Sequence, residues 1–173
     1  MAEEVTVIAD ASPLIALAMI ERLDLLHALF GAVKVVQAVC QEVLTGSFDP
    51  SERVIEQAFE RGWLELVGDE SPVFQAMPKA AVATWMHLDP GEAASISYAM
   101  RAPLRSKIII DELAGRSVCQ ALGLAHTGTL GIIALAKQEG IIASAKAEYA
   151  RLHAVGFWIA APLMRKMLAR VGE

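Results

Sequence analysis

Four acidic residues occupy positions where a parallel α/β sheet would bring carboxylates together. Asp10 and Asp111 each follow a short apolar run that predicts a β-strand. Both runs lead straight into predicted helices, so we expect both carboxylates at the carboxyl edge of the sheet, where open α/β sheets place their ligand crevice. Glu42 lies one turn into the helix after the second predicted strand. Glu92 lies in the first turn of the helix before the strand that ends at Asp111, so both are expected near the same edge.

Carboxylates that converge on one crevice repel one another unless a cation lies among them. A ligand set made only of oxygen atoms favours a hard cation, Mg²⁺ or Mn²⁺, over zinc. Such an ion binds a substrate phosphate and generates a metal-bound hydroxide for in-line attack. The pattern therefore predicts a metal-dependent site for phosphodiester hydrolysis. Asp10 and Asp111 are its primary metal ligands in this interpretation, and Glu42 and Glu92 complete the site.

Each of these residues also has an ordinary structural role that the sequence leaves open. Asp10 can hydrogen-bond the turn at Ser12-Pro13, and Ser12 can be a helix N-cap or a polar group behind a metal ligand. The remaining alternatives are an exposed helix position for Glu42, a capping box from Asp89 to Glu92, and an N-cap at Asp111 followed by a Glu112–Arg116 pair.

Other kinds of site find less support. The chain has no dinucleotide-binding glycine motif after its first strand, no P-loop and no G-x-S-x-G elbow. The histidines are scattered without metal-ligand spacing, although His126 ends the last predicted strand and could face the crevice. The tryptophans Trp63, Trp85 and Trp158 are expected to serve packing, and Cys40 and Cys119 are expected to be buried free thiols.

Composition limits the remaining choices. The chain has 173 residues, of which 55% are apolar, so it can bury a core without disulfides or a structural metal. With 15 Lys and Arg against 20 Asp and Glu, the net charge is −5 and no basic run occurs. This argues against nucleic-acid binding by bulk positive charge, but not against a metal site that meets phosphate. Without a basic leader or a long apolar stretch, a soluble, cytoplasmic protein that spans no membrane is expected.

Predicted strands alternate with predicted helices, which is typical of a parallel sheet covered on both faces. We expect strands near 5–9, 33–36, 63–67, 108–110 and 124–126. Residues 68–88 are expected to form an irregular loop within one domain, 1–173, with a core at about 5–142 and a helical extension at about 143–173. Helices are expected at about 12–20, 22–30, 38–44, 51–61, 89–100, 112–122, 128–138, from 144 and from 162.

Several segments in this order and spacing resemble the PIN domain, and within it the VapC-like toxin ribonucleases and a prokaryotic group of predicted nucleic-acid-binding PIN proteins. The matching segments are Val7-Ile8-Ala9-Asp10-Ala11-Ser12-Pro13-Leu14-Ile15-Ala16-Leu17, Val39-Cys40-Gln41-Glu42-Val43, Leu88-Asp89-Pro90-Gly91-Glu92-Ala93, Ile109-Ile110-Asp111-Glu112 with Arg116, Leu122-Gly123-Leu124 with Thr127-Gly128-Thr129-Leu130-Gly131, and Ala154-Val155-Gly156-Phe157-Trp158-Ile159.

The resemblance implies a three-layer α/β fold with a five-stranded parallel sheet, and an endoribonuclease that uses Mg²⁺ or Mn²⁺. Carried over residue by residue, its acids are Asp10, Glu42, Glu92 and Asp111, and Ser12 matches the small hydroxyl residue after the first acid. It also implies RNA as substrate, a small antitoxin as a partner, and a homodimer.

Two residues depart from the family pattern. Glu92 stands where Asp is commoner, and Ile109 stands where a hydroxyl residue is common. These departures and the acidic charge keep a second hypothesis open, a non-catalytic PIN-type module that binds RNA or a protein. From proximity in the sequence, Arg105 and Arg116 are candidates to steady a substrate phosphate.

Overall fold

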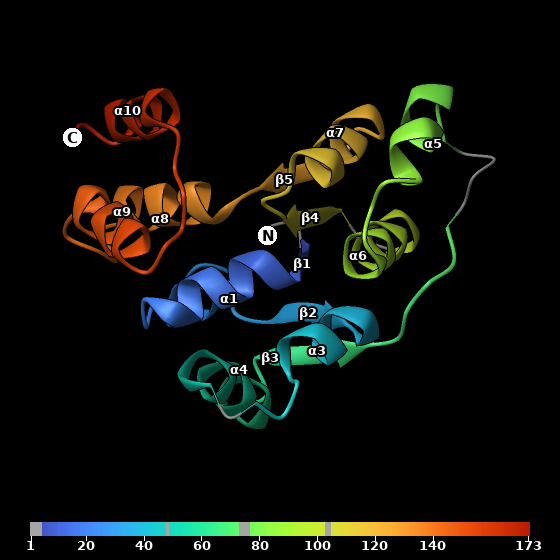
Figure 1. Cartoon of the computed structure of the whole chain (residues 1–173), viewed down its shortest axis with the longest axis horizontal. Helices are drawn as coiled ribbons and strands as arrows, with labels where there is room; N and C mark the ends of the chain where they lie inside the picture. The colour runs from blue at the N-terminus through green and yellow to red at the C-terminus, as the bar shows by residue number, and fades with distance from the viewer. Residues whose placement is uncertain (1–4, 48, 73–76, 103–104) are drawn as a thin grey trace.

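The chain folds around one five-stranded sheet (Figure 1). The computed structural model describes residues 5–47, 49–72, 77–102 and 105–173. The strands are β1 (Thr6–Ala9), β2 (Val33–Val36), β3 (Leu64–Val67), β4 (Ser106–Ile109) and β5 (Ala125–Thr127). They pair in the order β3-β2-β1-β4-β5, and every neighbouring pair is parallel. The predicted α/β fold with a five-stranded parallel sheet is confirmed.

Ten helices surround this sheet within the described residues. Nine of them correspond to predicted helices, with ends that shift by one or two residues. The helices are α1 (Ala11–Met19), α2 (Asp24–Phe30), α3 (Gln37–Val43), α4 (Pro50–Glu60), α5 (Lys79–Trp85), α6 (Pro90–Arg101), α7 (Leu113–Ala121), α8 (Thr129–Gln138), α9 (Ala145–Ala154) and α10 (Ala161–Arg170).

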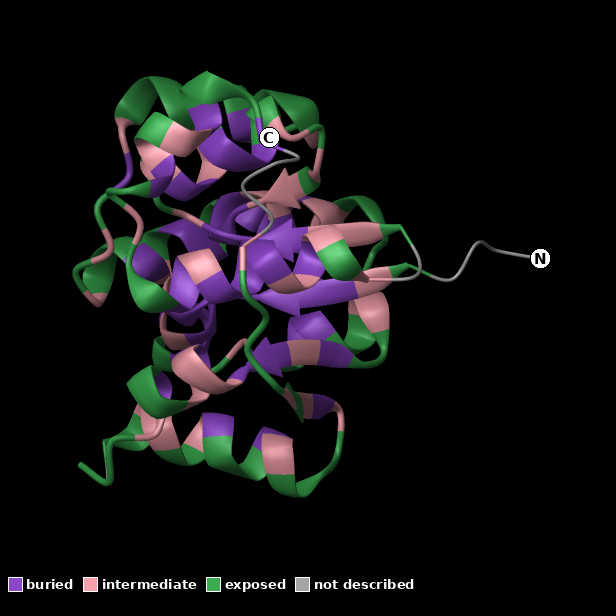
Figure 2. Ribbon diagram, turned by 90° about the vertical axis from the view of Figure 1, so that its right-hand side faces the viewer, coloured by how far each residue is buried: buried purple, intermediate pink, exposed green. Residues whose placement is uncertain are grey.

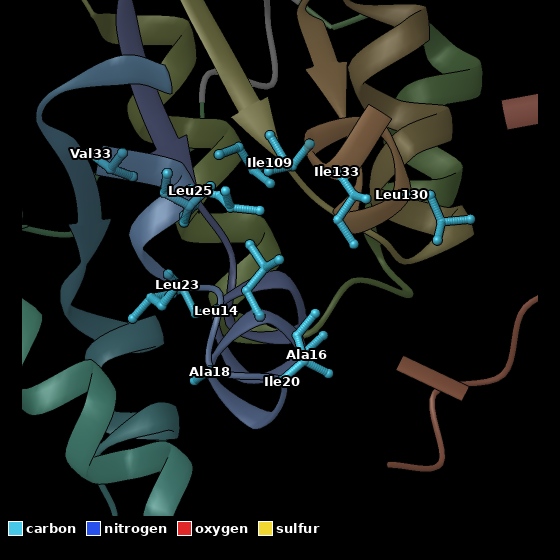
Figure 3. Packing of buried hydrophobic residues seen from close by; sticks show 14 of the residues in the cluster. Leu14, Ala16, Ala18, Ile20, Leu23, Leu25, Val33, Ile109, Leu130 and Ile133 are labelled. Carbon is cyan, nitrogen blue, oxygen red and sulfur yellow. The ribbon is translucent and has the colours of Figure 1, made fainter. Parts of the chain in front are cut away.

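The central strands are apolar on both sides because each side of the sheet faces its own layer of helices. Ala9 and Ile109 belong to the larger core, with residues of α1, α2 and α8, whereas Ile8 and Ile108 belong to a second core with residues of α5, α6 and α7. The strands form the buried centre of Figure 2, and Leu14, Leu25 and Ile109 crowd together in Figure 3. Each fully buried Leu or Ile stabilises the fold by about 1.5–3 kcal/mol.

Two expectations about local structure are wrong. Residues 68–88 do not form one loop, because α5 occupies residues 79–85 and buries Ala81 and Trp85 in the second core. Ser12 is not the N-cap of the first helix. That helix begins at Ala11, so the cap position falls to Asp10, whose side chain makes no capping hydrogen bond.

The C-terminal helices α9 and α10 pack against α8 (Figure 1). Glu148 on α9 is buried and accepts hydrogen bonds from Nε of Arg22 at 2.9 Å and from Nη1 of Arg151 at 3.0 Å. The buried Tyr149 hydroxyl donates to the carbonyl oxygen of Leu130 at 2.9 Å. These buried polar contacts fix the tail on the core, because breaking them would leave unsatisfied groups inside the protein.

The cysteines and tryptophans differ in how far they are buried. Cys119 is buried as expected, but Cys40 is only half-buried. Trp85 packs in the core and Trp63 stacks on His27, whereas Trp158 is 79% exposed, so the expectation that it serves packing is wrong. No helix among the described residues has both the length and the apolar character that crossing a bilayer requires.

Candidate active site

Asp10 lies at the carboxyl edge of the sheet, directly after β1. Its backbone N–H donates to the carbonyl oxygen of Ile109 at 3.0 Å, which continues the β1–β4 pairing. The residue is only 2% exposed, and its Oδ1 atom has no hydrogen-bond partner among the described residues. Since buried carboxylates are normally paired, an unpartnered oxygen here is one that a cation could bind.

Glu92 reaches the same edge from the other side. It closes the predicted capping box of α6: the N–H of Glu92 donates to Oδ1 of Asp89 at 2.8 Å, and the N–H of Asp89 donates to Oε2 of Glu92 at 3.1 Å. Glu92 is 3% exposed, and its second oxygen, Oε1, lies against Gly115 of α7, whose backbone N–H acts to lower the pKa of the carboxyl. This oxygen makes no hydrogen bond of ordinary geometry within the described part of the chain. The capping box thus orients one oxygen and leaves the other available.

Four acids lie near one another at this edge. A Cβ on Gly91 would stand 3.2 Å from Oε2 of Glu42 and 3.3 Å from Oδ1 of Asp89, which accepts from the N–H of Glu92. Burial, followed by the negative charges of Asp89, Glu92 and Glu42, raises the pKa of Asp10 to about 8. Burial and the charge of Asp89 also raise the pKa values of Glu42 and Glu92. We call Asp10, Glu42, Asp89 and Glu92 the acidic cluster. Two carboxylates are buried in it, whereas Glu42 and Asp89 lie exposed at its rim.

Asp111 follows β4 and is held by different contacts. One carboxylate oxygen accepts from the N–H of Thr129 at 2.7 Å, and the other accepts from the Thr129 hydroxyl at 2.6 Å. Burial raises the pKa of Asp111, while the Thr129 hydrogen bonds and the charge of Arg116 act in the opposite direction. Asp111 therefore lies at the start of α8 rather than capping α7, whose N-cap residue is Glu112.

The other predicted site residues divide between the two edges of the sheet. Arg116 lies close to Asp111, since a Cβ on Gly128 would stand 2.5 Å from Oδ1 of Asp111 and 3.0 Å from Nη1 of Arg116. Arg105 lies at the opposite edge, where its carbonyl oxygen accepts from the N–H of Thr6. The expectation that Arg105 meets the substrate phosphate is corrected accordingly.

Ser12 and His126 border the site without joining the acidic cluster. Ser12 is half-buried in a groove lined by Val155 and Phe157, and His126 lines a pocket that it shares with Asp111. One ring nitrogen of His126, Nδ1, lies 3.0 Å from the carbonyl oxygen of Leu124.

The acidic cluster offers the oxygen donors that a hard divalent cation prefers, but it does not surround one position with a complete set of ligands. In residues 5–47, 49–72, 77–102 and 105–173, no three His, Cys, Asp or Glu side chains are placed to hold one ion. The fit rests on two buried carboxylate oxygens without partners, Oδ1 of Asp10 and Oε1 of Glu92. Mg²⁺ is commonly held by one or two carboxylates, with water and substrate phosphate filling its other positions.

Two residues of the site were not predicted. The sequence predicts Asp89 only as a helix cap, although its charge acts on three other acids; its position in the capping box with Glu92 is the signal that could have placed it in the site. The sequence predicts no role for Thr129, because nothing in it pairs this residue with Asp111, 18 residues away.

Close packing at Gly115 supports the position of Glu92 and gives a stability prediction. A Cβ on this residue of α7 would stand 2.3 Å from Cδ1 of Ile110 and 2.7 Å from Oε1 of Glu92. We expect Gly115→Ala to destabilise the protein by about 1–3 kcal/mol in urea unfolding, as overpacked cores do. Gly68→Ala is the matched control, because a Cβ there meets nothing within 4 Å. Equal stabilities of the two variants would contradict the close packing.

Comparison with known proteins agrees with this architecture. The model of the family DUF3368, described as a PIN domain, matches residues 6–173. No curated protein matches the chain significantly. The match covers nearly the whole chain, including all five strands and every member of the acidic cluster. The chain therefore belongs to the PIN-domain family, whose members are generally nucleases that use divalent metal ions.

Proposed function

We propose that the protein is an endoribonuclease that uses Mg²⁺ or Mn²⁺ to hydrolyse RNA phosphodiesters. The observation that carries the proposal is the pair of buried, unpartnered carboxylate oxygens on Asp10 and Glu92 inside the acidic cluster. Without a counter-charge, this arrangement costs free energy in the folded protein. A divalent cation removes the cost and explains why the acids are kept together.

Each residue of the site has its own role in the proposed hydrolysis. Asp10 and Glu92 would hold the ion, in place of the pair Asp10 and Asp111 expected from the sequence, because both oxygens of Asp111 accept hydrogen bonds from Thr129. When bound, the ion supplies a Lewis acid for the phosphate and lowers the pKa of a bound water. Glu42 is exposed at the rim with a raised pKa, which suits it to accept the proton of the attacking water. Asp111 would complete the acidic edge of the site, and Arg116, which lies close to it, would meet a phosphate oxygen.

The orientation of Asp111 depends on Thr129, which gives a second prediction. Thr129→Val removes the hydroxyl hydrogen bond of 2.6 Å and keeps the backbone one. Residues that orient a metal site are commonly worth 10- to 100-fold in affinity or activity, so we expect a loss of roughly 10-fold in kcat/KM. Thr129→Ser keeps a hydroxyl and is expected to stay within about 3-fold of the wild type. If Thr129→Val were as active as Thr129→Ser, the hydroxyl of Thr129 would not be needed to orient Asp111.

The proposed activity is tested with chelator-treated protein and labelled single-stranded RNA, incubated with Mg²⁺, with Mn²⁺ or with neither. Cleavage that appears only with the cation is the expected result. Asp111→Asn tests the second strand-end acid, and Glu60→Gln, an exposed acid on α4, is the control. RNA binding without cleavage in folded, metal-saturated protein would instead favour the non-catalytic binding module.

The toxin role is a separate expectation of the same proposal. Expression of the wild-type protein in a bacterial host is expected to arrest growth, and expression of Asp10→Asn is not. A small co-encoded antitoxin would relieve the arrest. Harmless expression of an active enzyme would remove the toxin role and leave the nuclease.

A further inference from the structure

A pocket of about 310 Å³ lies beside Asp111, between the ends of β4 and β5 and the C-terminal tail. Asp111, Arg116 and His126 line its sheet side, and Trp158 and Arg170 line its tail side. We call it the Trp158 pocket. Its volume is at the lower end of the range for small-molecule sites, which suits one nucleotide rather than a duplex.

Trp158 is held outward by its two neighbours. Ile159 is buried in the larger core and Phe157 packs against that core, while the backbone N–H of Phe157 donates to the carbonyl oxygen of Leu152 at 2.9 Å. In an extended segment, alternate side chains point in opposite directions. The indole between these two anchors is therefore 79% exposed on a fixed backbone. Figure 1 shows the segment between α9 and α10 passing the start of α8.

The charge of this pocket differs from that of the whole chain. Arg116 and Arg170 against Asp111 give it a formal charge of +1, in a chain whose net charge is −5. An exposed indole with arginines beside it is what single-stranded RNA binds, through base stacking and phosphate contacts. The acidic edge of the sheet supplies no such contacts.

We propose that the Trp158 pocket holds one nucleotide of a single-stranded RNA next to the scissile phosphate. Its base stacks on the indole of Trp158, and its phosphate meets Arg116 and Arg170. The position of the scissile phosphate rests on the proposed function, whereas the binding of the base does not. The RNA-binding surface is thus formed jointly by residues at the carboxyl edge of the sheet and by residues of the C-terminal tail.

The test measures binding separately from cleavage. A fluorescein-labelled single-stranded RNA octamer is titrated, by anisotropy, into Asp10→Asn protein alone and with Trp158→Ala or Trp158→Phe. We expect Trp158→Ala to raise Kd about 5- to 100-fold, the usual worth of one stacked base, and Trp158→Phe to change Kd less than about 3-fold. Met86→Ala, at a residue 75% exposed outside the pocket, is the control.

Two further readouts identify the contacts. Arg170→Ala should weaken binding and lower the slope of log K against log salt by about one phosphate contact. In the active enzyme, Trp158→Ala should raise KM and leave kcat within about 2-fold, because the indole binds RNA without touching the reacting atoms.

The outcomes separate the two proposals. Unchanged RNA affinity in Trp158→Ala would overturn the proposal that the Trp158 pocket binds a nucleotide. If light scattering also showed that this variant had lost a dimer, the indole would instead contact a second copy of the chain. Failure of the wild type to cleave, with Trp158-dependent binding intact, would overturn the nuclease and keep the pocket. No RNA binding by any form at low salt would overturn the pocket as well.

Discussion

Asp10→Asn is expected to lower metal-dependent RNA cleavage by at least about 100-fold, since even the partners that merely orient a metal ligand are worth roughly 10- to 100-fold. Asn keeps the size of the side chain and one carbonyl oxygen but removes the negative charge that would attract the cation. The residue is buried at the strand end, and its Oδ1 is one of the two oxygens that would hold the cation. The measurement is the initial rate of cleavage of labelled RNA at saturating Mn²⁺.

The control for this variant is Glu60→Gln, which removes one negative charge from an exposed position on α4. Its rate is expected to match that of the wild type. Glu92→Gln removes the second buried carboxylate and should resemble Asp10→Asn. If Asp10→Asn retained more than about a tenth of the wild-type rate, Asp10 would not hold the ion.

The same substitution is expected to stabilise the protein when metal is absent. Asp10 ionises in the unfolded chain near its ordinary pKa of 3.8, but in the folded protein only near pH 8, because of burial and the charges of Asp89, Glu92 and Glu42. Below about pH 4 both states are protonated and the stability is fully present. As the pH rises from about 4 to about 8, only the unfolded state releases the proton, so the folded state progressively loses stability.

At pH 7 this loss is on the order of 4 kcal/mol, because pH 7 lies about 3.2 pH units above the pKa of 3.8 in the unfolded chain, and Asn avoids it because it carries no charge. We expect chelator-treated Asp10→Asn to melt roughly 8–16 °C above chelator-treated wild type at pH 7, and close to it at pH 4. Mn²⁺ should raise the melting temperature of the wild type and have little effect on the variant. A metal-free variant that melts below the wild type at pH 7 would mean that the acidic cluster is not a strained site.

The sequence predicts the positions of the acids well where local rules determine them. Asp10 and Asp111 follow short apolar strands, and such strands in a parallel sheet end at one edge. Glu92 is oriented by a capping box with Asp89, which needs only a spacing of three residues. The capping box acts within one element, and the strand-end rule needs only that the strands are parallel, so neither depends on which strands are neighbours.

Contacts between distant segments cannot be predicted in this way. Thr129 meets Asp111 because β5 pairs with β4 in a register that aligns Thr127 with Ile109, and no pattern in the sequence specifies that register. For Arg105, closeness in the sequence wrongly predicts closeness in space. It stands six residues before Asp111, but a strand rises about 3.3 Å per residue, so the two lie at opposite edges of the sheet.

The exposure of Trp158 in the C-terminal tail likewise depends on contacts that the sequence does not predict. An aromatic residue between Phe157 and Ile159 is typical of a packed segment, and the sequence does not say which of the three turns away from the core. Packing in the larger core decides this, because it buries Ile159 and leaves the indole exposed at the pocket. The residues that bind substrate in our account are thus harder to predict than the acids that would perform the chemistry.

A crystal soaked in Mn²⁺ tests the central claim most directly, because the anomalous scattering of manganese locates the ion independently of any activity. Our account predicts an anomalous peak next to Oδ1 of Asp10 and Oε1 of Glu92, and no such peak in Asp10→Asn crystals treated alike. A wild-type crystal saturated with Mn²⁺ that shows no peak at the acidic cluster, or one only elsewhere, would contradict the account.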